Sequence, residues 1–297
     1  MAALHTLKEK ILNFTLEGSE IGARGYDRVL FQVCGYAGNG KSSFINSLIY
    51  SLRGGRYNHR ASVSSATESQ GGCTMRRNSY PLTDTITLVD NRGFSKSDEN
   101  EMEEVYAQLS HLQPLDENVI WETSFAERMK SVIKVKPEFK DLLIPILVHS
   151  AELKLYEDGG KRMRDFLTTA KKLTGCAPII IITKKLSGDA ETLEKQFKKL
   201  GMENIFAVEN YTVEDCTKTK EKEEMFLTIL STALDQVDFM VHIWSSLPGP
   251  EEAHYNRMQL VLEIAHRNEM EKRIEGEKNK WQEDHGRKNN KKPCSLQ

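Results

Sequence analysis

The chain has 297 residues and a formal net charge of −2, and its 28% of charged and 39% of hydrophobic residues are typical of a globular protein with one large core. A net charge this small gives no general attraction to nucleic acid, and the basic residues of the tail are not interleaved with aromatic ones, so we expect no nucleic-acid partner. No signal-peptide pattern and no apolar run approaching about 18 residues is present, which predicts a cytoplasmic protein.

The first segments of the chain predict a helix, a strand and a second helix. Apolar residues recur at near-helical spacing within residues 1–25, which favours a leading amphipathic helix. The apolar run 29–34 favours a buried strand, and 43–49 has the single apolar face of a helix. Between them, residues 35–42 read Gly-Tyr-Ala-Gly-Asn-Gly-Lys-Ser. This segment fits the phosphate-loop pattern G-x-x-x-x-G-K-[ST] at every fixed position, in the strand–loop–helix setting that the pattern requires.

This loop has the chemistry of a phosphate site. Its glycines let backbone N–H groups turn toward phosphate oxygens, and the following helix adds the partial positive charge of its N-terminus. Lys41 is expected to reach the β- and γ-phosphates and to act in catalysis, and the Ser42 hydroxyl to ligate Mg²⁺. The residues expected to contact nucleotide here are Gly35, Gly38, Asn39, Gly40, Lys41, Ser42 and Ser43.

A second part of the site is expected after the next strand. Residues 85–90 show the alternating apolar pattern that is typical of a strand, and they end in Asp90. Asp90 is the first residue and Gly93 the last of a D-x-x-G arrangement. An aspartate here can hold Mg²⁺ through a water, and the glycine N–H can sense the γ-phosphate. The polar loop before this strand is expected to supply a threonine that completes the metal shell and serves catalysis, with Thr74 the first choice and Thr67 the second.

The rest of the chain alternates between strand and helix patterns. Strands are expected at 78–82 (an edge strand, because of Pro81), 142–148, 178–183 and 205–208, and helices at 99–112, 122–135, 161–173, 190–200 and 221–240. This alternation predicts an α/β fold with a mostly parallel sheet covered on both faces, over residues 26–245. Ligands in such folds lie beyond the carboxyl ends of the strands. A charged helix is expected at 246–283 and a disordered basic tail at 284–297.

Two segments resemble a known family. The segment 38–48, Gly-Asn-Gly-Lys-Ser-Ser-Phe-Ile-Asn-Ser-Leu, resembles the first motif of the dynamin-like and interferon-inducible GTPases. The segment 208–212, Val-Glu-Asn-Tyr-Thr, and the helix after it resemble the interferon-induced protein 44 family in particular. The resemblance covers about residues 25–245. It implies a P-loop GTPase fold in three layers and a role in innate immunity. The expected ligands are GTP or GDP with Mg²⁺, and a homo-oligomer is a further expectation.

The motif that selects guanine in GTPases departs from the family pattern. Residues 183–186 read Thr-Lys-Lys-Leu, so Leu186 stands where N/T-K-x-D has an aspartate that accepts hydrogen bonds from guanine N1 and N2. ATP therefore stays an alternative ligand. Asp189 either replaces that aspartate or begins a helix. The residues expected on the base side are Thr183, Lys184, Glu209 and Asn210, with Lys184 laying its aliphatic stem along the base.

The residue after D-x-x-G also departs from the pattern. Many GTPases place a glutamine there to orient the attacking water, and Phe94 has no group that can do so. We therefore expect slow intrinsic hydrolysis, raised by self-association or by a partner. Arg76 and Arg77 are candidate arginine fingers in cis, and the alternative is that they are solvated loop arginines. The same two alternatives apply to Arg92. His149 either faces the site or is structural.

These departures keep two other functions open. One is a nucleotide-binding scaffold without turnover, which the leucine and phenylalanine substitutions favour. The other is an ATPase or a small-molecule kinase, although no arginine-rich lid segment follows the later strands.

The end of the chain predicts a lipid anchor. It reads Cys294-Ser295-Leu296-Gln297, which fits the C-a-a-X pattern with a last residue that permits farnesylation of Cys294. A single lipid chain gives only marginal membrane binding, and the basic residues just upstream supply the second attraction that such anchors need. We expect membrane association through this tail. A basic tail that merely contains a cysteine is the alternative.

Overall fold

Six strands form one sheet in the order β2-β3-β1-β4-β5-β6. This arrangement comes from a computed structural model, which describes residues 2–61, 76–94, 99–119, 124–134, 140–155, 160–243 and 247–289. The strands are β1 (Arg28–Cys34), β2 (Asn78–Pro81), β3 (Ile86–Asp90), β4 (Asp141–Ser150), β5 (Ile179–Thr183) and β6 (Ile205–Ala207). All neighbouring strands run parallel except β2, which pairs antiparallel with β3 at the edge. The expected α/β architecture with a mostly parallel sheet is therefore confirmed.

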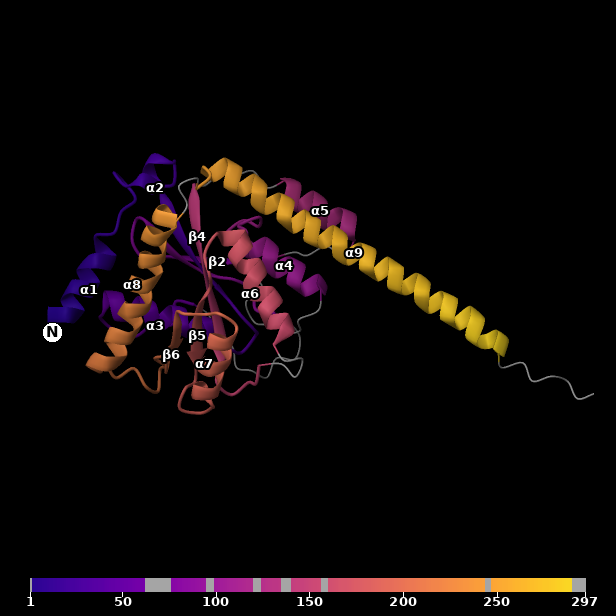
Figure 1. The fold of residues 1–297 in the computed structure, drawn as a ribbon. Coiled ribbons are helices and arrows are strands. Elements are labelled where there is room, and N and C mark those ends of the chain that lie inside the picture. Colours follow the sequence, from indigo (N-terminus) through magenta and orange to yellow (C-terminus); the bar gives the residue numbers. More distant parts are fainter. Residues whose placement is uncertain are drawn as a thin grey trace, which may run out of the picture.

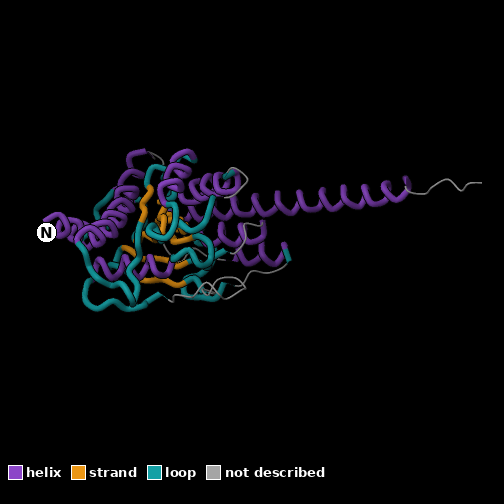
Figure 2. The backbone as a smooth tube through the Cα atoms, turned by 90° about the horizontal axis from the view of Figure 1, so that it is seen from below, coloured by secondary structure: helices purple, strands orange, loops and turns teal. Residues whose placement is uncertain are grey.

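Helices cover both faces of this sheet. One face carries α1 (Ala2–Leu12), α3 (Lys41–Arg53) and α8 (Lys220–Ile243). The other carries α4 (Glu99–Leu109), α6 (Lys161–Thr174), α7 (Ala190–Lys199) and α9 (Pro250–Asn289), with α5 (Phe125–Lys134) packed on α9. The short α2 (Glu20–Ala23) precedes β1. Figure 2 shows the strands running between these helices, and α9 extending away from them.

The central strands are apolar on both faces because both faces are covered. Phe31 and Val33 of β1 join the cluster that contains Phe44 of α3, whereas Cys34 joins the cluster that contains Phe166 of α6. The four isoleucines of β5 are likewise completely buried. A continuous β-branched run is what a parallel strand between two helical layers requires.

Pro145 lies inside β4, a position that proline rarely takes in a central strand. Pro145 is in register with Gln32 of β1, but the pairing of β4 with β5 begins only at Ile146. At Pro145 the strand therefore has a paired neighbour on one side only. This local edge explains how β4 accommodates a residue that lacks an N–H group.

The last helix is longer than the sequence predicts. We expected disorder from residue 284, but α9 continues to Asn289, and its outer half extends beyond the sheet and the other helices (Figure 1). The residues after 284 are polar, yet the next proline is Pro293, so no helix-breaking ring stops α9 earlier. Among the described residues, no helix combines the length and the apolar character needed to cross a membrane.

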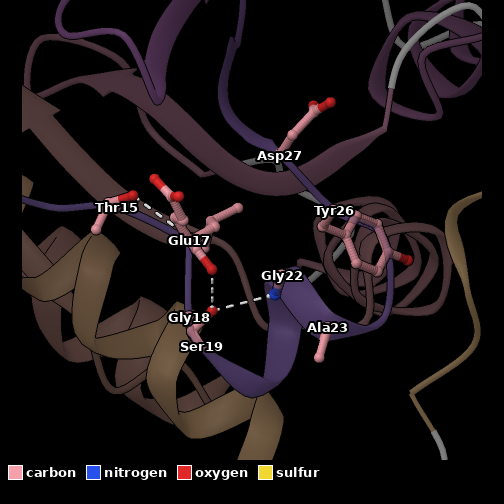
Figure 3. A pocket seen from close by; sticks show the side chains of 9 residues that line it. Thr15, Glu17, Gly18, Ser19, Gly22, Ala23, Tyr26 and Asp27 are labelled. Atoms are coloured by element: carbon pink, nitrogen blue, oxygen red, sulfur yellow. Dashed lines mark hydrogen bonds between the residues drawn. The ribbon is translucent and has the colours of Figure 1, made fainter.

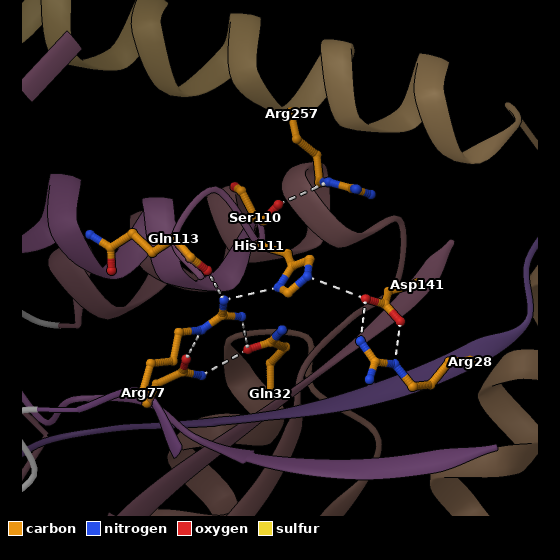
Figure 4. Close-up of polar contacts among 9 residues, drawn as sticks. Arg28, Gln32, Arg77, Ser110, His111, Gln113, Asp141 and Arg257 are labelled. Atoms are coloured by element: carbon orange, nitrogen blue, oxygen red, sulfur yellow. Dashed lines mark hydrogen bonds and ion pairs between the residues drawn. The ribbon is translucent and has the colours of Figure 1, made fainter. Parts of the chain in front are cut away.

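A buried polar network joins β1, β4 and Arg77, the residue before β2, to the segment after α4 (Figure 4). Arg77 is completely buried, and its guanidinium donates to Asn91 Oδ1 at 2.9 Å, to Gln32 Oε1 at 3.0 Å, to His111 Nδ1 at 2.9 Å and to the carbonyl of Gln113. His111 Nε2 in turn lies 3.2 Å from Asp141 Oδ2.

The network continues to the start of β1 and is covered by α9. Arg28 donates to both oxygens of Asp141, at 2.6 and 2.9 Å. From α9, Arg257 donates to the carbonyl of Ser110 at 3.1 Å (Figure 4). Since these side chains come from distant parts of the sequence, the network ties the edge of the sheet to the helices above it.

The network fixes the protonation of His111. An arginine can only donate, so His111 Nδ1 must accept and the proton of the neutral ring sits on Nε2, directed at Asp141. Burial, with a smaller contribution from the charge of Arg77, lowers the pKa of His111 to about 4, although Asp141 acts in the opposite direction. The His111 ring is therefore neutral at pH 7.

This protonation state predicts that the fold loses stability in mild acid. Between its ordinary pKa and about 4, His111 binds a proton in the unfolded chain and not in the folded one. Stability falls with decreasing pH across that window, by about 1.4 kcal/mol per unit for this residue. We expect His111→Asn, which tolerates the left-handed backbone of residue 111 (φ 55°), to remove this part of the slope.

The measurement is urea unfolding of both proteins from pH 4.5 to 7.5. Other groups titrate in the same range, so the quantity of interest is the difference between the two curves. Equal slopes for wild type and variant would contradict the prediction.

Candidate functional site

The loop 35–42 has a backbone that only glycine adopts easily at three positions. Gly35, Gly38 and Gly40 have φ of 143°, 78° and 83°. A Cβ at Gly35 would collide with the carbonyl of Val148, and one at Gly40 would lie 3.2 Å from Asn210 Nδ2. The glycines that the sequence pattern singles out are thus required both by conformation and by space.

Lys41 opens α3 and folds back into the loop. Its side chain is buried, and Nζ donates to the carbonyls of Gly35 and Tyr36, both at 3.1 Å. Burial lowers the pKa of Lys41, and the nearby carboxylate of Asp90 opposes that shift. Ser42 and Ser43 follow in the first turn, where helical N–H groups have no intrahelical acceptor. An ammonium and free N–H groups together make this end of α3 suited to an anion.

Ser42 meets Asp90 at the end of β3. Ser42 Oγ donates to Asp90 Oδ2 at 2.8 Å, and Asp90 is 1% exposed. Its other oxygen, Oδ1, is buried with no hydrogen-bond partner among the described residues. Burial raises the pKa of Asp90, whereas Lys41 and Ser42 lower it. A hydroxyl and a carboxylate with an unused oxygen are the ligands that Mg²⁺ prefers, so the residues present fit this ion.

Gly93 and Phe94 lie directly on the loop. Ala37 N donates to the carbonyl of Phe94 at 2.9 Å, and a Cβ added at Gly93 would lie 2.5 Å from Lys41 Nζ. Phe94 is buried, with its ring 4.2 Å from that of Tyr36 and 6.2 Å from that of Phe166. Phe94 thus serves as an apolar anchor for this segment. The D-x-x-G glycine therefore lies close to Lys41.

The other side of the loop is secured by the ends of β5 and β6. Thr183 Oγ1 donates to the carbonyl of Asn39 at 2.7 Å, and Asn210 Nδ2 donates to the carbonyl of Gly40 at 3.2 Å. Thr183 is completely buried, so its hydroxyl supports the loop 35–42 from the interior of the protein. The Oδ1 atoms of Asn39 and Asn210 are buried without a partner among the described residues. Together with Asp90 Oδ1, they leave three unused acceptors around one loop.

The remaining base-side candidates form an exposed rim. Lys184 has a left-handed backbone, with φ of 54°, and pairs with Glu152 at 2.5 Å. The Leu186 side chain is 80% exposed, and its backbone N–H donates to Glu209 Oε2 at 3.3 Å. Leu186 and Glu209, from different strand ends, are therefore neighbours.

Two polar residues near this rim have structural roles. Asp189 is the N-cap of α7 and accepts from the N–H of Thr192 at 3.0 Å, so the helix-start alternative describes it. His149 is buried with Nδ1 2.9 Å from the carbonyl oxygen of Ser150, and burial lowers the pKa of its ring. His149 therefore packs in the core beneath the site.

The candidate arginines do not converge on the loop. Arg77 is completely buried, and the described contacts of its guanidinium are to residues of the network in Figure 4. Its role as an arginine finger stays a prediction. Arg76 is exposed and donates to the carbonyl of Asp116. Arg92 pairs with Glu104 of α4 at 3.2 Å. Thr74, Thr67 and Cys294 lie outside the described residues.

Sequence reasoning missed the residues that hold Arg92. Its backbone N–H donates to Gln108 Oε1 at 2.8 Å, and Gln108 Nε2 donates to Glu104 Oε1 at 3.2 Å. Both residues are buried on α4, four positions apart. Polar residues at that spacing on a buried helix face were the available signal, since they must find polar partners.

A separate cavity of about 580 Å³ lies at the other end of β1, beside α2 (Figure 3). Among the described residues that line it are the acids Glu17 and Asp27, and no lysine or arginine. Thr15 and Ser19 use their hydroxyls to accept from backbone N–H groups of their own turns. An acidic wall repels phosphate, so the nucleotide candidate is the loop 35–42.

Comparison of the sequence with protein-family models gives no match, and comparison with curated proteins gives none. The assignment of function therefore rests on the geometry of the site.

Proposed function

We propose that this chain binds a guanine nucleoside triphosphate with Mg²⁺ at the loop 35–42, and that its fold is that of a P-loop GTPase. The observation that carries this proposal is the contact between Ser42 and the buried Asp90, 2.8 Å apart beside the buried Lys41. A hydroxyl, a carboxylate and an ammonium from three sequence positions meet at a helix N-terminus, where each suits part of a metal triphosphate. The unused buried oxygen of Asp90 supports the same proposal, because a metal ion would satisfy it.

The proposed roles follow from the positions of the groups. Lys41 would exchange its two carbonyl partners for β- and γ-phosphate oxygens, and N–H groups of the loop and of Ser42 and Ser43 would bind the rest of the phosphate chain. Ser42 and Asp90 would hold Mg²⁺, which supplies neutralisation of the phosphate charge. Gly93 lies close enough to Lys41 to follow the terminal phosphate.

Competition binding tests the choice of nucleotide. A fluorescent GTP analogue bound in Mg²⁺ is displaced by GTP and by ATP in separate titrations. We expect GTP to compete at least tenfold better than ATP. Equal or better competition by ATP would replace the guanine assignment by the ATP-binding alternative, and no binding of either would remove the proposal.

We propose slow hydrolysis, raised when copies of the chain associate or when a partner binds. Phe94 is buried in an aromatic contact and offers no hydrogen bond to water, and the described contacts of Arg77 and Arg92 are to protein groups. The same features favour the second candidate, a nucleotide-binding scaffold without turnover. Phosphate release measured as a function of protein concentration separates the two: turnover that rises with concentration supports the slow GTPase, and none above background supports the scaffold.

The C-terminal lipid anchor also stays a proposal, based on the sequence 294–297 alone, as does a role of the interferon-inducible kind in innate immunity. Labelled isoprenoid supplied to cells that express the chain should be incorporated and should move part of the protein to membranes. Incorporation that persists in Cys294→Ser would contradict the anchor assignment.

A further inference from the structure

The loops after β5 and β6 lie on the side of the phosphate loop away from Asp90. Asp90 approaches from β3, whereas Thr183 and Asn210 donate to the carbonyls of Asn39 and Gly40 from the β5–β6 side. In the sheet, β1 separates β3 from β4, β5 and β6. A nucleotide with its metal end beside Asp90 therefore has its base over the loops that follow β5 and β6.

Most carboxylates of this rim are already engaged. They are Glu152 with Lys184, Asp189 with the N–H of Thr192, Glu214 with Thr212, and Asp215 with Lys222. Glu209 differs, because it forms no ion pair with a described residue and its Oε2 accepts one long hydrogen bond of 3.3 Å from the N–H of Leu186. It is also the residue next to Asn210, which contacts the phosphate loop directly.

This carboxylate matches one purine and not the other. Guanine presents two adjacent donors, N1–H and the 2-amino group, and an ionised carboxylate is an acceptor with two oxygens. Adenine presents an acceptor at N1, which a carboxylate repels. The exposed Leu186 beside Glu209 adds an apolar surface suited to the face of a base. The position of Leu186, where an aspartate is missing, thus has a carboxylate supplied from the next strand end.

Resting on the function proposed above, we propose that Glu209 is the residue that selects guanine, by accepting from N1–H and the 2-amino group. The carboxylate reaches the base from the loop after β6 and replaces the aspartate that residue 186 lacks. Leu186 holds Glu209 through its backbone N–H, so the leucine side chain does not affect that contact.

The test compares wild type with Glu209→Gln and with Glu203→Gln, a matched change at an exposed position before β6. Glutamine keeps an oxygen for the N–H of Leu186, so the loop is retained. Affinities for GTP, ATP and XTP are measured by competition in Mg²⁺, and melting temperatures check the fold. We expect Glu209→Gln to weaken the affinity for GTP by about 10- to 100-fold and to leave the affinity for ATP unchanged. We expect the same variant to bind XTP more tightly than wild type does, because a glutamine amide can donate to the 2-carbonyl of xanthine.

The outcomes separate this inference from the proposed function. A loss of affinity for GTP with an unchanged affinity for ATP supports Glu209 as the selecting residue. A gain in affinity for XTP strengthens that conclusion. An unchanged preference for GTP in Glu209→Gln overturns the role of Glu209 and leaves nucleotide binding in place. An equal loss of affinity for GTP and for ATP also overturns the role of Glu209, since a residue that only maintains the structure affects the binding of both nucleotides. Failure of wild type to bind any nucleotide removes the proposed function itself.

Discussion

Replacing Lys41 by methionine should reduce GTP affinity at least about 100-fold while leaving the protein folded. Methionine keeps an unbranched side chain of similar length at this buried position, so the change removes the ammonium and little packing. Hydrogen bonds from a charged donor contribute about 1.5–3 kcal/mol each, and every 1.4 kcal/mol corresponds to a factor of ten in affinity. Two such bonds, to the β- and γ-phosphates, account for the expected loss.

Calorimetric titration with Mg²⁺ and GTP is the measurement for Lys41→Met. The matched control is Lys172→Met, which removes a charge from an exposed position on α6 and should bind as wild type does. Urea unfolding of both variants shows whether the fold is kept. Wild-type affinity in a folded Lys41→Met protein would exclude the loop 35–42 as the phosphate site.

A second large effect is expected at Arg77, on stability. Replacement by leucine leaves the oxygens of Asn91 and Gln113, and Nδ1 of His111, without their donor inside the protein. Gln32 Oε1 keeps one of its two donors, the side-chain amide of Asn91 at 3.0 Å. Buried acceptors without donors, and loss of one member of a buried charged network, cost about 3–5 kcal/mol. Arg77→Lys should recover only part of this, because one ammonium cannot reach partners arranged around a planar guanidinium.

The neighbouring arginine provides the control. Arg76 is exposed and contacts the carbonyl of Asp116, so Arg76→Leu should change the free energy of unfolding by less than about 1 kcal/mol. Chemical denaturation of the three variants measures the difference directly. A loss below about 1 kcal/mol in Arg77→Leu would show that the network of Figure 4 contributes little to stability.

This pair of arginines also shows what the sequence could not predict. Arg76 and Arg77 are adjacent and identical in type, so local pattern cannot say which one is buried. The difference arises because Gln32, Asn91 and His111, from three other segments, assemble around one of them. Such contacts depend on the packed fold and leave no periodic signal in the chain.

The features that the sequence did predict are local ones. The loop 35–42 needs glycines within a few residues, and Asp90 follows its strand directly, so spacing alone identifies both. Their meeting follows from the strand order of the structure, in which β1 and β3 are parallel neighbours and end on the same side of the sheet. Thr183 was expected to contact the nucleotide base. Its burial under Asn39 depends on how β5 ends beneath the loop, which the sequence does not show. The metal and base contacts themselves stay predictions.

The length of α9 has a consequence for how the molecule tumbles. Its 40 residues, at about 1.5 Å each, make a rod of roughly 60 Å, whereas a compact chain of this size has a radius of gyration of about 19 Å. Met270, Ile274 and Trp281 on the outer half are exposed, and that half extends past the sheet (Figure 1). The hydrodynamic drag therefore exceeds that of a sphere of equal mass, and a molecular weight read from size-exclusion elution overstates that of a single copy.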